Sequence, residues 1–370
     1  MTIRVNGKIV TPTGVIRQGC VEITDDRITA VAEYPSTREG HWIVPGFVDI
    51  HTHGGGGHTF TTGDADAARQ AAAFHLSHGT TTLLASLVSS PYDLMRSATA
   101  AFAPLVADGV LAGIHFEGPY LSTARCGAQN PEHLRDPSLD ELNALIELGQ
   151  GAVRMVTLAP ERQGALDAIK LLASRGVIAA VGHTDATYEQ TLAAISAGAT
   201  VGTHVFNGMR PPHHREPGPV YALLGAAGVV CEFVADGVHL HDGTLAFATS
   251  VTGPDRAALI TDAISAAGMP DGEYELGGQA VVVTDGVARL ARDGTIAGST
   301  LTMDAALRRA VAAGVSMVDA CRMAATTPAR AIGLGDRVGA IARGLRADLV
   351  VLDDDLRVVR VMRAGVWVED

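Results

Sequence analysis

The chain has 370 residues and a mass of 38.2 kDa, enough for one α/β barrel of about 250 residues and a smaller accessory domain. Hydrophobic residues make up 47% and charged residues 18%, which excludes a disordered chain. The formal net charge of −12, with acidic and basic residues interspersed, argues against nucleic acid and anionic membranes as partners.

Cysteine usage and the first residues indicate the compartment. Cys20, Cys126, Cys231 and Cys321 lie far apart without a CxxC motif, so we expect reduced thiols and no disulfide. The first residues lack the apolar segment of a signal peptide, and no uncharged run that is also apolar throughout reaches the about 18–20 residues of a membrane-spanning helix. These features predict a soluble cytoplasmic protein.

Two rhythms follow each other along the chain. Residues 1–43 alternate short apolar stretches with turn signals, which predicts a β-meander. From Val44 onwards, strands alternate with helices, which predicts a parallel sheet. Eight strands are expected, the number of a (β/α)8 barrel: Gly46–His53, Thr80–Leu87, Val110–Glu117, Val153–Ala159, Val177–His183, Ala199–Phe206, Val229–Asp236 and Ala258–Asp262.

Helix signals separate the strands. Ser138 to Glu141 reads as a capping box that opens a helix ending at Gly149. Two further helices, Ala165–Arg175 and Tyr188–Ala197, are each followed by glycine. Beyond the eighth strand we expect β structure at Gly278–Arg292, helices from Thr302 to Ile332, and strands in the tail.

The predicted fold is therefore α/β, a (β/α)8 TIM-like barrel with a small β-sandwich domain. The barrel spans 44–337 and carries a β insertion at 273–293. Residues 1–43 and 338–370 pair to form the β-sandwich beside it.

Metal-ligand side chains fall at the ends of the predicted strands. His51 and His53 are two residues apart, so both imidazoles point to one face of the first strand. Four other strands end in a ligand-type side chain: Glu117, His183, His204 and Asp262. For each residue alone, a hydrogen-bonded polar group of the core is the alternative. Because the carboxyl ends of barrel strands converge, the whole set predicts a metal centre.

The arrangement predicts two divalent ions per subunit. The first-strand histidines and Asp262 would hold one ion, His183 and His204 the other, with Glu117 shared. Paired ions about 3.5–4 Å apart activate water at neutral pH, so the expected chemistry is hydrolysis. Asp262 would carry a proton from that water to the leaving group. Zinc is favoured, with iron, manganese and cobalt as alternatives.

Longer strings resemble a known family. The His-x-His pair, the later strand-end histidines, the aspartate after strand eight and the tail string Gly339–Val350 look like the amidohydrolase superfamily. Within it, His115–Pro119, Thr203–Met209 and Arg215–Gly218 resemble the N-acetylglucosamine-6-phosphate deacetylase family, and the likeness covers essentially the whole chain. The resemblance implies hydrolysis of N-acetyl-D-glucosamine 6-phosphate to D-glucosamine 6-phosphate and acetate, in amino-sugar catabolism and cell-wall recycling.

The same resemblance implies roles for further residues. His239 would polarise the amide carbonyl of the acetyl group, and Asn207 and Gly208 would meet the sugar phosphate. Arg215 would bind phosphate in the neighbouring subunit's site, which implies a homodimer. A loop beside the sugar is expected at Ile296, Ala297 and Gly298.

Two comparisons within the superfamily refine these expectations. Hydantoinase- and dihydroorotase-like relatives bridge their metals with a carboxylated lysine on strand four, where this chain has none, so Glu117 is expected to supply the bridging carboxylate. Many deacetylase relatives have a basic residue, glycine, a small residue and histidine where this chain reads Cys126, Gly, Ala128, Gln129. Ala128 and Gln129 would meet the substrate, with Gln129 donating to a sugar hydroxyl without carrying charge, and Cys126 would be a thiol on a mobile loop with access to the site.

Two alternative functions stay open at this point. An N-acetylgalactosamine-6-phosphate deacetylase would differ only in the orientation of one substrate hydroxyl. A metal-free amidohydrolase-like protein that acts through interactions would have lost metal ligands, whereas all six are present here.

Overall fold

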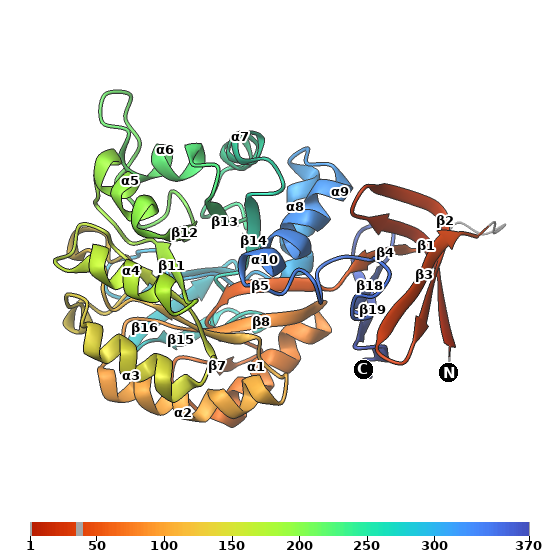
Figure 1. Cartoon of the computed structure of the whole chain (residues 1–370), viewed down its shortest axis with the longest axis horizontal. Helices are drawn as coiled ribbons and strands as arrows, with labels where there is room; N and C mark the ends of the chain where they lie inside the picture. The colour runs from red at the N-terminus through yellow and green to blue at the C-terminus, as the bar shows by residue number, and fades with distance from the viewer. Residues whose placement is uncertain (1, 35–39, 370) are drawn as a thin grey trace.

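The structure is a computed structural model that describes residues 2–34 and 40–369. Residues 1, 35–39 and 370, which belong to the predicted β-sandwich ranges, lie outside the described residues. Figure 1 shows a large α/β body beside a smaller all-β body, and the two ends of the chain lie in the smaller one.

The large body is the predicted barrel. Its eight strands are parallel and neighbour one another in chain order: β5 (Phe47–Thr52), β8 (Thr80–Leu87), β9 (Gly113–Glu117), β10 (Val153–Leu158), β11 (Ile178–Val181), β12 (Ala199–Gly202), β13 (Val230–Val234) and β14 (Ala257–Ile260). The first and last strands meet through side-chain and backbone bonds. Thr261 Oγ1 donates to Asp49 Oδ2 at 2.5 Å, and the Asp262 N–H donates to the His51 carbonyl at 2.9 Å.

Helices surround the barrel (Figure 1). They are α1 (Ala65–Ser77), α2 (Tyr92–Ala107), α3 (Leu139–Gly149), α4 (Ala165–Ser174), α5 (Tyr188–Ala197), α6 (Gly218–Gly225), α7 (Asp242–Thr252) and α8 (Met303–Ala312). The expected cap of α3 is present, because Ser138 Oγ accepts from the Glu141 N–H at 3.3 Å. The stretch Thr302–Ile332 is helical in pieces: after α8 come α9 (Met317–Cys321), a π-helical turn (Arg322–Thr326) and α10 (Thr327–Ala331).

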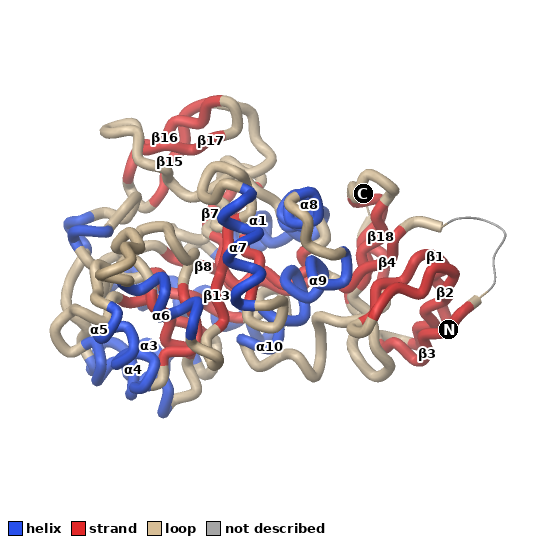
Figure 2. Tube along the Cα trace, turned by 90° about the horizontal axis from the view of Figure 1, so that it is seen from above, coloured by secondary structure: helices blue, strands red, loops and turns tan. Residues whose placement is uncertain are grey.

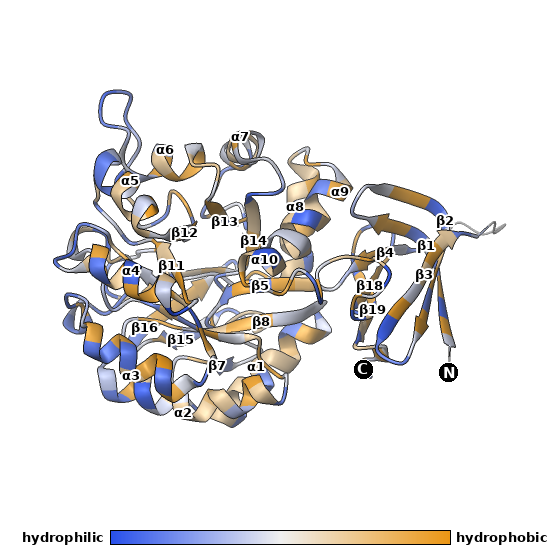
Figure 3. Cartoon of the chain, viewed as in Figure 1, coloured by the Kyte–Doolittle hydropathy of each residue, from blue (hydrophilic) through white to orange (hydrophobic). Residues whose placement is uncertain are grey.

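The strands carry apolar side chains on both faces because both faces are covered, and buried polar side chains such as Asp49 and His51 stand among them. Every residue of β5 and β8 is buried, and Phe47, Leu84, Phe102 and Phe233 belong to the barrel core. Burying a side chain of this size contributes roughly 1.5–3 kcal/mol. Figure 3 shows apolar and polar residues alternating along the surrounding helices, and the buried apolar residues of helices and strands belong to one core.

The small body joins segments from opposite ends of the chain. Its seven strands lie in the order β20-β19-β18-β4-β1-β2-β3. Their bounds are β1 (Thr2–Thr11), β2 (Gly14–Thr24), β3 (Arg27–Glu33), β4 (Trp42–Pro45), β18 (Leu349–Leu352), β19 (Val358–Arg363) and β20 (Val366–Trp367). β4 and β18 pair antiparallel, with Val44 opposite Val350. The predicted fold class is thus confirmed, while the domain boundaries at residues 43 and 338 stay predictions.

A three-stranded antiparallel sheet projects from one edge of the barrel (Figure 2). It comprises β15 (Gly272–Leu276), β16 (Gln279–Thr284) and β17 (Val287–Leu290), and packs its own apolar cluster against Val88 and Ile264. A two-stranded ribbon, β6 (Gly54–Gly55) and β7 (His58–Thr59), follows β5. Across the described residues, no helix combines the length and apolar character needed to cross a membrane.

Candidate active site

The six predicted metal ligands lie together at the carboxyl end of the barrel, and all are buried. They form two groups, each with its ligand atoms within 4.8 Å of one another: His51, His53 and Asp262 in one, and Glu117, His183 and His204 in the other. Glu117 links the groups, because its Oε2 is 3.3 Å from His53 Nε2 and its Oε1 is 2.9 Å from His204 Nε2.

Three of these side chains reach the centre because the backbone turns sharply at the end of its strand. His183, His204 and Asp262 have φ values of 46°, 26° and 50°. Each lies two residues beyond a strand that ends at Val181, Gly202 or Ile260, so the strand ends predicted from the sequence were wrong here. Left-handed conformations cost non-glycine residues roughly 1–2 kcal/mol and cluster at functional sites.

The outer nitrogen of three histidines is held by a backbone carbonyl. The Nδ1–H groups donate over 2.9–3.1 Å in the pairs His53 to Ser86, His183 to Arg125 and His204 to Asn207. Since a carbonyl only accepts, Nδ1 carries the proton in each neutral ring and the Nε2 lone pair faces the centre. Partners that fix the tautomer in this way are typical of metal-binding histidines.

With these tautomers, the Nε2 atoms that face the centre carry no proton and cannot donate a hydrogen bond to one another. His51 Nε2 and His53 Nε2 are 3.2 Å apart, and His183 Nε2 and His204 Nε2 are 3.1 Å apart. Glu117 Oε1 lies 3.0 Å from His183 Nε2. Lone pairs and carboxylate oxygens so close together repel one another unless a proton or a metal cation lies between them. Imidazole nitrogen with carboxylate oxygen is a donor set that fits a divalent transition metal.

Charge at the centre points the same way. Burial raises the pKa of Glu117, but the charges of His51 and His183 outweigh it and hold this pKa well below its ordinary value. Burial lowers the pKa of His53, yet bonds to Asp262 and Glu117 raise it to about 9. Burial raises the pKa of Asp262, but the His53 bond and the charge of His51 bring it below its usual range. The carboxylates thus favour positive charge in this position.

Glu232 completes the support of the site and was missed by the sequence analysis. It is fully buried on β13, where its Oε2 accepts from His51 Nδ1 at 3.1 Å and from the His204 N–H at 3.2 Å. One carboxylate therefore orients a residue of each group. A single charged residue within the apolar stretch 229–234 of the predicted strand Val229–Asp236 was the signal that could have revealed it.

A cavity of about 250 Å³ opens beside the two groups. The predicted substrate residues that line it are Ala128, Gln129, Asn207, Gly208, His239, Ile296 and Gly298. Val88, Leu276 and Thr295 also line it and were not predicted. Leu276 ends β15, so the projecting sheet forms part of the cavity wall. The alternation of apolar and polar residues predicts the strands of this projecting sheet, but it does not predict which part of the barrel the sheet packs against.

His239 faces the metal-ligand groups across this cavity. Its Nδ1 donates to Asp236 Oδ2 at 2.6 Å, and its Nε2 lies 4.0 Å from Asp262 Oδ2. Burial lowers the pKa of His239, but the hydrogen bond and charge of Asp236 raise it above its ordinary value. Asp236 was not among the predicted site residues, although its position three residues before His239 in a short loop was a usable signal.

Gln129 contacts one of the predicted metal-ligand residues directly. Its Nε2 donates to Glu117 Oε2 at 2.5 Å, and its Oε1 accepts from the Ser89 N–H at 2.6 Å. The side chain is 3% exposed. Gln129 therefore orients Glu117 in addition to lining the cavity, a contact that the sequence did not suggest.

Three predicted residues do not line the cavity. Cys126 is half-buried beside Gly127, which does line it. Ala297 is fully buried in the core of the projecting sheet. Arg215 is exposed, and its Nη1 lies 2.8 Å from His214 Nε2. Its predicted action on a neighbouring subunit stays a prediction.

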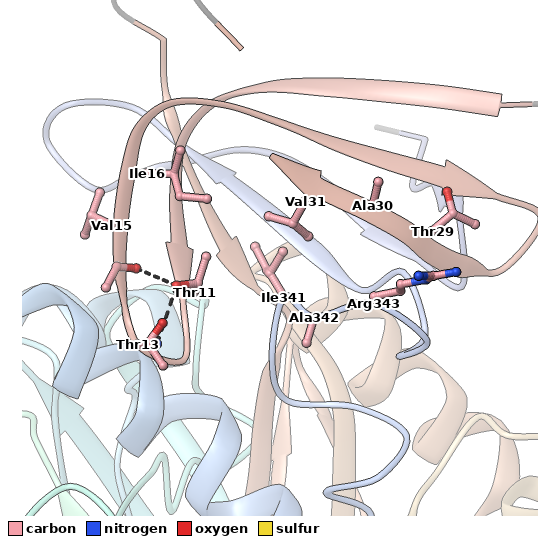
Figure 4. Close-up of a pocket in the computed structure, with 11 residues that line it drawn as sticks. Thr11, Thr13, Val15, Ile16, Thr29, Ala30, Val31, Ile341, Ala342 and Arg343 are labelled. Atoms are coloured by element: carbon pink, nitrogen blue, oxygen red, sulfur yellow. Dashed lines mark hydrogen bonds between the residues drawn. The ribbon is translucent and has the colours of Figure 1, made fainter. Parts of the chain in front are cut away.

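A larger cavity of about 590 Å³ lies in the small β body, between the β1–β2 hairpin, β3 and residues 341–343 (Figure 4). Threonines, small apolar side chains and Arg343 line it. Its described lining contains no imidazole or carboxylate, so the chemistry belongs to the smaller cavity in the barrel.

Comparison with known proteins agrees with this geometry. Residues 42–368 match the amidohydrolase family. The N-acetylglucosamine-6-phosphate deacetylase of Lysinibacillus sphaericus is 33% identical over 97% of this chain and 96% of its own. The N-acetylgalactosamine-6-phosphate deacetylase of Escherichia coli O157:H7 is 36% identical over 97% of each chain. The crystal structure of N-acetyl-D-glucosamine-6-phosphate deacetylase from Mycobacterium smegmatis superimposes with a TM-score of 0.96, at 47% identity over 99% of this chain and 100% of that one.

The chain therefore belongs to the amidohydrolase family and, within it, to the amino-sugar 6-phosphate deacetylases that these relatives represent.

Proposed function

We propose that this protein hydrolyses the N-acetyl group of N-acetyl-D-glucosamine 6-phosphate to D-glucosamine 6-phosphate and acetate, in amino-sugar catabolism and cell-wall recycling. The observation that carries the proposal is the pair of buried ligand groups, joined by Glu117, at the floor of a cavity that His239 also lines. The glucosamine enzyme of Mycobacterium smegmatis is 47% identical to this chain over nearly its whole length, and this likeness favours the gluco substrate. The glucosamine enzyme of Lysinibacillus sphaericus, at 33%, and the galactosamine enzyme of Escherichia coli, at 36%, do not separate the two substrates.

The six ligand residues would hold two divalent ions, and zinc is proposed ahead of iron, manganese and cobalt. Divalent ions in this position supply Lewis-acid activation of water and of the amide carbonyl. The alternative of a metal-free interaction protein is not favoured, because the complete ligand set is present and oriented.

Asp262 and His239 are the proposed catalytic residues. Asp262 accepts the proton of the attacking water and delivers it to the amide nitrogen as the C–N bond breaks. His239 donates from Nε2 to the carbonyl oxygen, where negative charge develops. Their position supports these roles, since Asp262 Oδ2 and His239 Nε2 lie 4.0 Å apart at the cavity and Asp236 fixes the ring of His239.

Asn207, Gly208 and Arg215 are proposed to recognise the phosphate. Asn207 and Gly208 line the cavity, and Gly208 has a φ of 59° and lies against the His183 ring. Arg215, exposed on the loop before α6, is proposed to enter the site of a second copy in a cytoplasmic homodimer.

Acetate release from the purified, metal-loaded protein tests the function. We expect N-acetylglucosamine 6-phosphate to react far faster than unphosphorylated N-acetylglucosamine. Equal rates on both sugars would remove the phosphate assignment, and a faster reaction on the galactosamine epimer would favour that substrate. No turnover on any of the three at full metal loading would reject the function.

A mixing experiment tests the shared site. Dimers of the Arg215→Ala variant would lack the arginine that binds the substrate phosphate. Dimers of the Asp262→Asn variant would lack the residue that carries the proton. If Arg215 acts on the neighbouring subunit, heterodimers formed by mixing the two inactive variants regain activity, because one site is then complete. If mixing restores nothing although heterodimers form, Arg215 does not act across the interface.

A further inference from the structure

A third cavity, about 110 Å³, concentrates positive charge at the opposite end of the barrel from the active site. It lies where the amino-terminal ends of β8, β9 and β10 meet the small β body, and Thr82 and Ala112 form part of its wall. Four arginines line it and come from distant parts of the chain: Arg154 of β10, Arg337 and Arg346 of the segment before β18, and Arg363 of β19.

Only one of these arginines has an acidic partner among the described residues. Arg346 Nε donates to Asp348 Oδ2 at 2.9 Å, and Asp348 Oδ1 also accepts from the Ala364 N–H at 2.8 Å. Arg363 donates to the neutral carbonyl of Gly109. The Nε of Arg154 is buried without a hydrogen-bond partner. The described part of the chain thus supplies one carboxylate for four guanidinium groups.

Such an arrangement is unfavourable without a further anion. Buried donors that stay unpaired cost free energy, and like charges in a partly buried space repel one another. Burial and the charge of Arg346 lower the pKa of Arg363, and the charge of Asp348 opposes them only in part. The concentration of positive charge is also unexpected in a chain with a net charge of −12.

We propose that this cavity binds an oxyanion of the phosphate class, either inorganic phosphate or the phosphoryl group of a small metabolite. The planar guanidinium fork matches the spacing of phosphate oxygens. The volume equals that of roughly four waters at about 30 Å³ each, so it admits one tetrahedral oxyanion. The anion bridges Arg154 of the barrel and Arg363 of the small β body, and therefore fastens the two together.

Phosphate binding tests this site directly. Isothermal titration of metal-loaded protein with inorganic phosphate, at ionic strength held constant with chloride, gives the affinity, and thermal unfolding gives the stabilisation. We expect saturable binding and a rise in Tm. Arg154→Gln and Arg337→Gln each weaken this binding about tenfold or more, because each removes charge-assisted bonds. Arg337 is exposed, so its variant tests the proposal even if Arg154→Gln fails to fold.

Two controls separate this site from the active site and from general charge. Arg17→Gln makes the same change at an exposed position of β2 outside the cavity, and it should bind phosphate like the unmodified protein. The KM for N-acetylglucosamine 6-phosphate, and any competitive inhibition by phosphate, should be equal in all variants.

The proposal is overturned if phosphate does not bind saturably, if the cavity variants bind it as Arg17→Gln does, or if its binding is lost whenever substrate occupies the active site. Titration with glycerol 3-phosphate beside inorganic phosphate identifies the source of the anion. Tighter binding of glycerol 3-phosphate indicates a phosphorylated metabolite, and tighter binding of inorganic phosphate indicates the free ion.

Discussion

Changing Glu232 to glutamine removes one negative charge from the support of the metal site and leaves its shape. Glu232 Oε2 accepts from His51 Nδ1 in one ligand group and from the His204 N–H in the other, at 3.1 and 3.2 Å. The amide oxygen of glutamine can still accept these bonds. What disappears is the charge that, with that of Glu117, raises the pKa of His51.

The expected size follows from this geometry. Replacing a carboxylate that supports a metal-binding histidine typically costs about 10–100-fold in metal affinity or activity. That range corresponds to about 1.4–2.7 kcal/mol. We expect the upper part of it, because Glu232 is fully buried and supports both groups. Alanine would do more damage, since two buried donors would lose their acceptor at about 1–3 kcal/mol each.

Competition with a chelator, followed by elemental analysis and kcat/KM at saturating metal, measures the effect. Glu189→Gln, on the exposed face of α5, is the matched control and should behave like the unmodified protein. A Glu232→Gln protein with unchanged metal affinity and unchanged turnover would refute the reasoning that this carboxylate orients the ligands.

Three further predictions concern single features. Changing His51 to Gln together with His53 to Asn should reduce bound metal from about two ions to one by elemental analysis; two tightly held ions would mean that β5 supplies no ligands. Asp262→Asn should keep the fold and substrate binding, checked by circular dichroism and titration, and lower kcat by about 10²–10⁴-fold or more; near-normal kcat at normal metal loading would exclude it as the proton carrier. Asp304, buried against Arg308 at 2.6 Å, has its pKa held below the ordinary value because bonds to His78, Thr302 and Arg308 outweigh burial. Asp304→Asn should therefore lose about 1.5–3 kcal/mol of stability in urea at pH 7. A depressed carboxylate stabilises above its unfolded pKa of about 3.9, so this gap should narrow at pH 3, and a gap that stays constant would contradict the assignment.

The barrel could be predicted because its strands are rich in apolar residues and its helices end at or near glycines. The range Thr80–Leu87 matches β8, and Tyr188–Ala197 matches α5. Strand ends near the ligands could not be predicted. Left-handed backbone at His183 and His204 is imposed by the surrounding structure and not by the residues themselves, since histidine has no intrinsic preference strong enough to end a strand there.

The metal-ligand residues could be predicted from the sequence more readily than the residues that support them. His-x-His and strand-end carboxylates announce metal chemistry by residue type, and the structure brings all six ligands together. Glu232 contacts His51, which lies 181 positions earlier in the chain, and Gln129 contacts Glu117, which lies 12 positions earlier. Spacing along the chain does not reveal such contacts. The arginine-lined cavity could not be predicted for the same reason, because its four arginines come together only when the chain folds.

The pairing of β4 with β18 sets an order of events during synthesis. Val44 can meet Val350 only after about three hundred intervening residues have left the ribosome, whereas β1, β2 and β3 pair with their neighbours at once. Contacts so distant in sequence form slowly, because the loop they close is long. The early hairpins must therefore wait with an open sheet edge while the barrel grows, a period in which this edge is exposed to chaperones and to pairing with other chains.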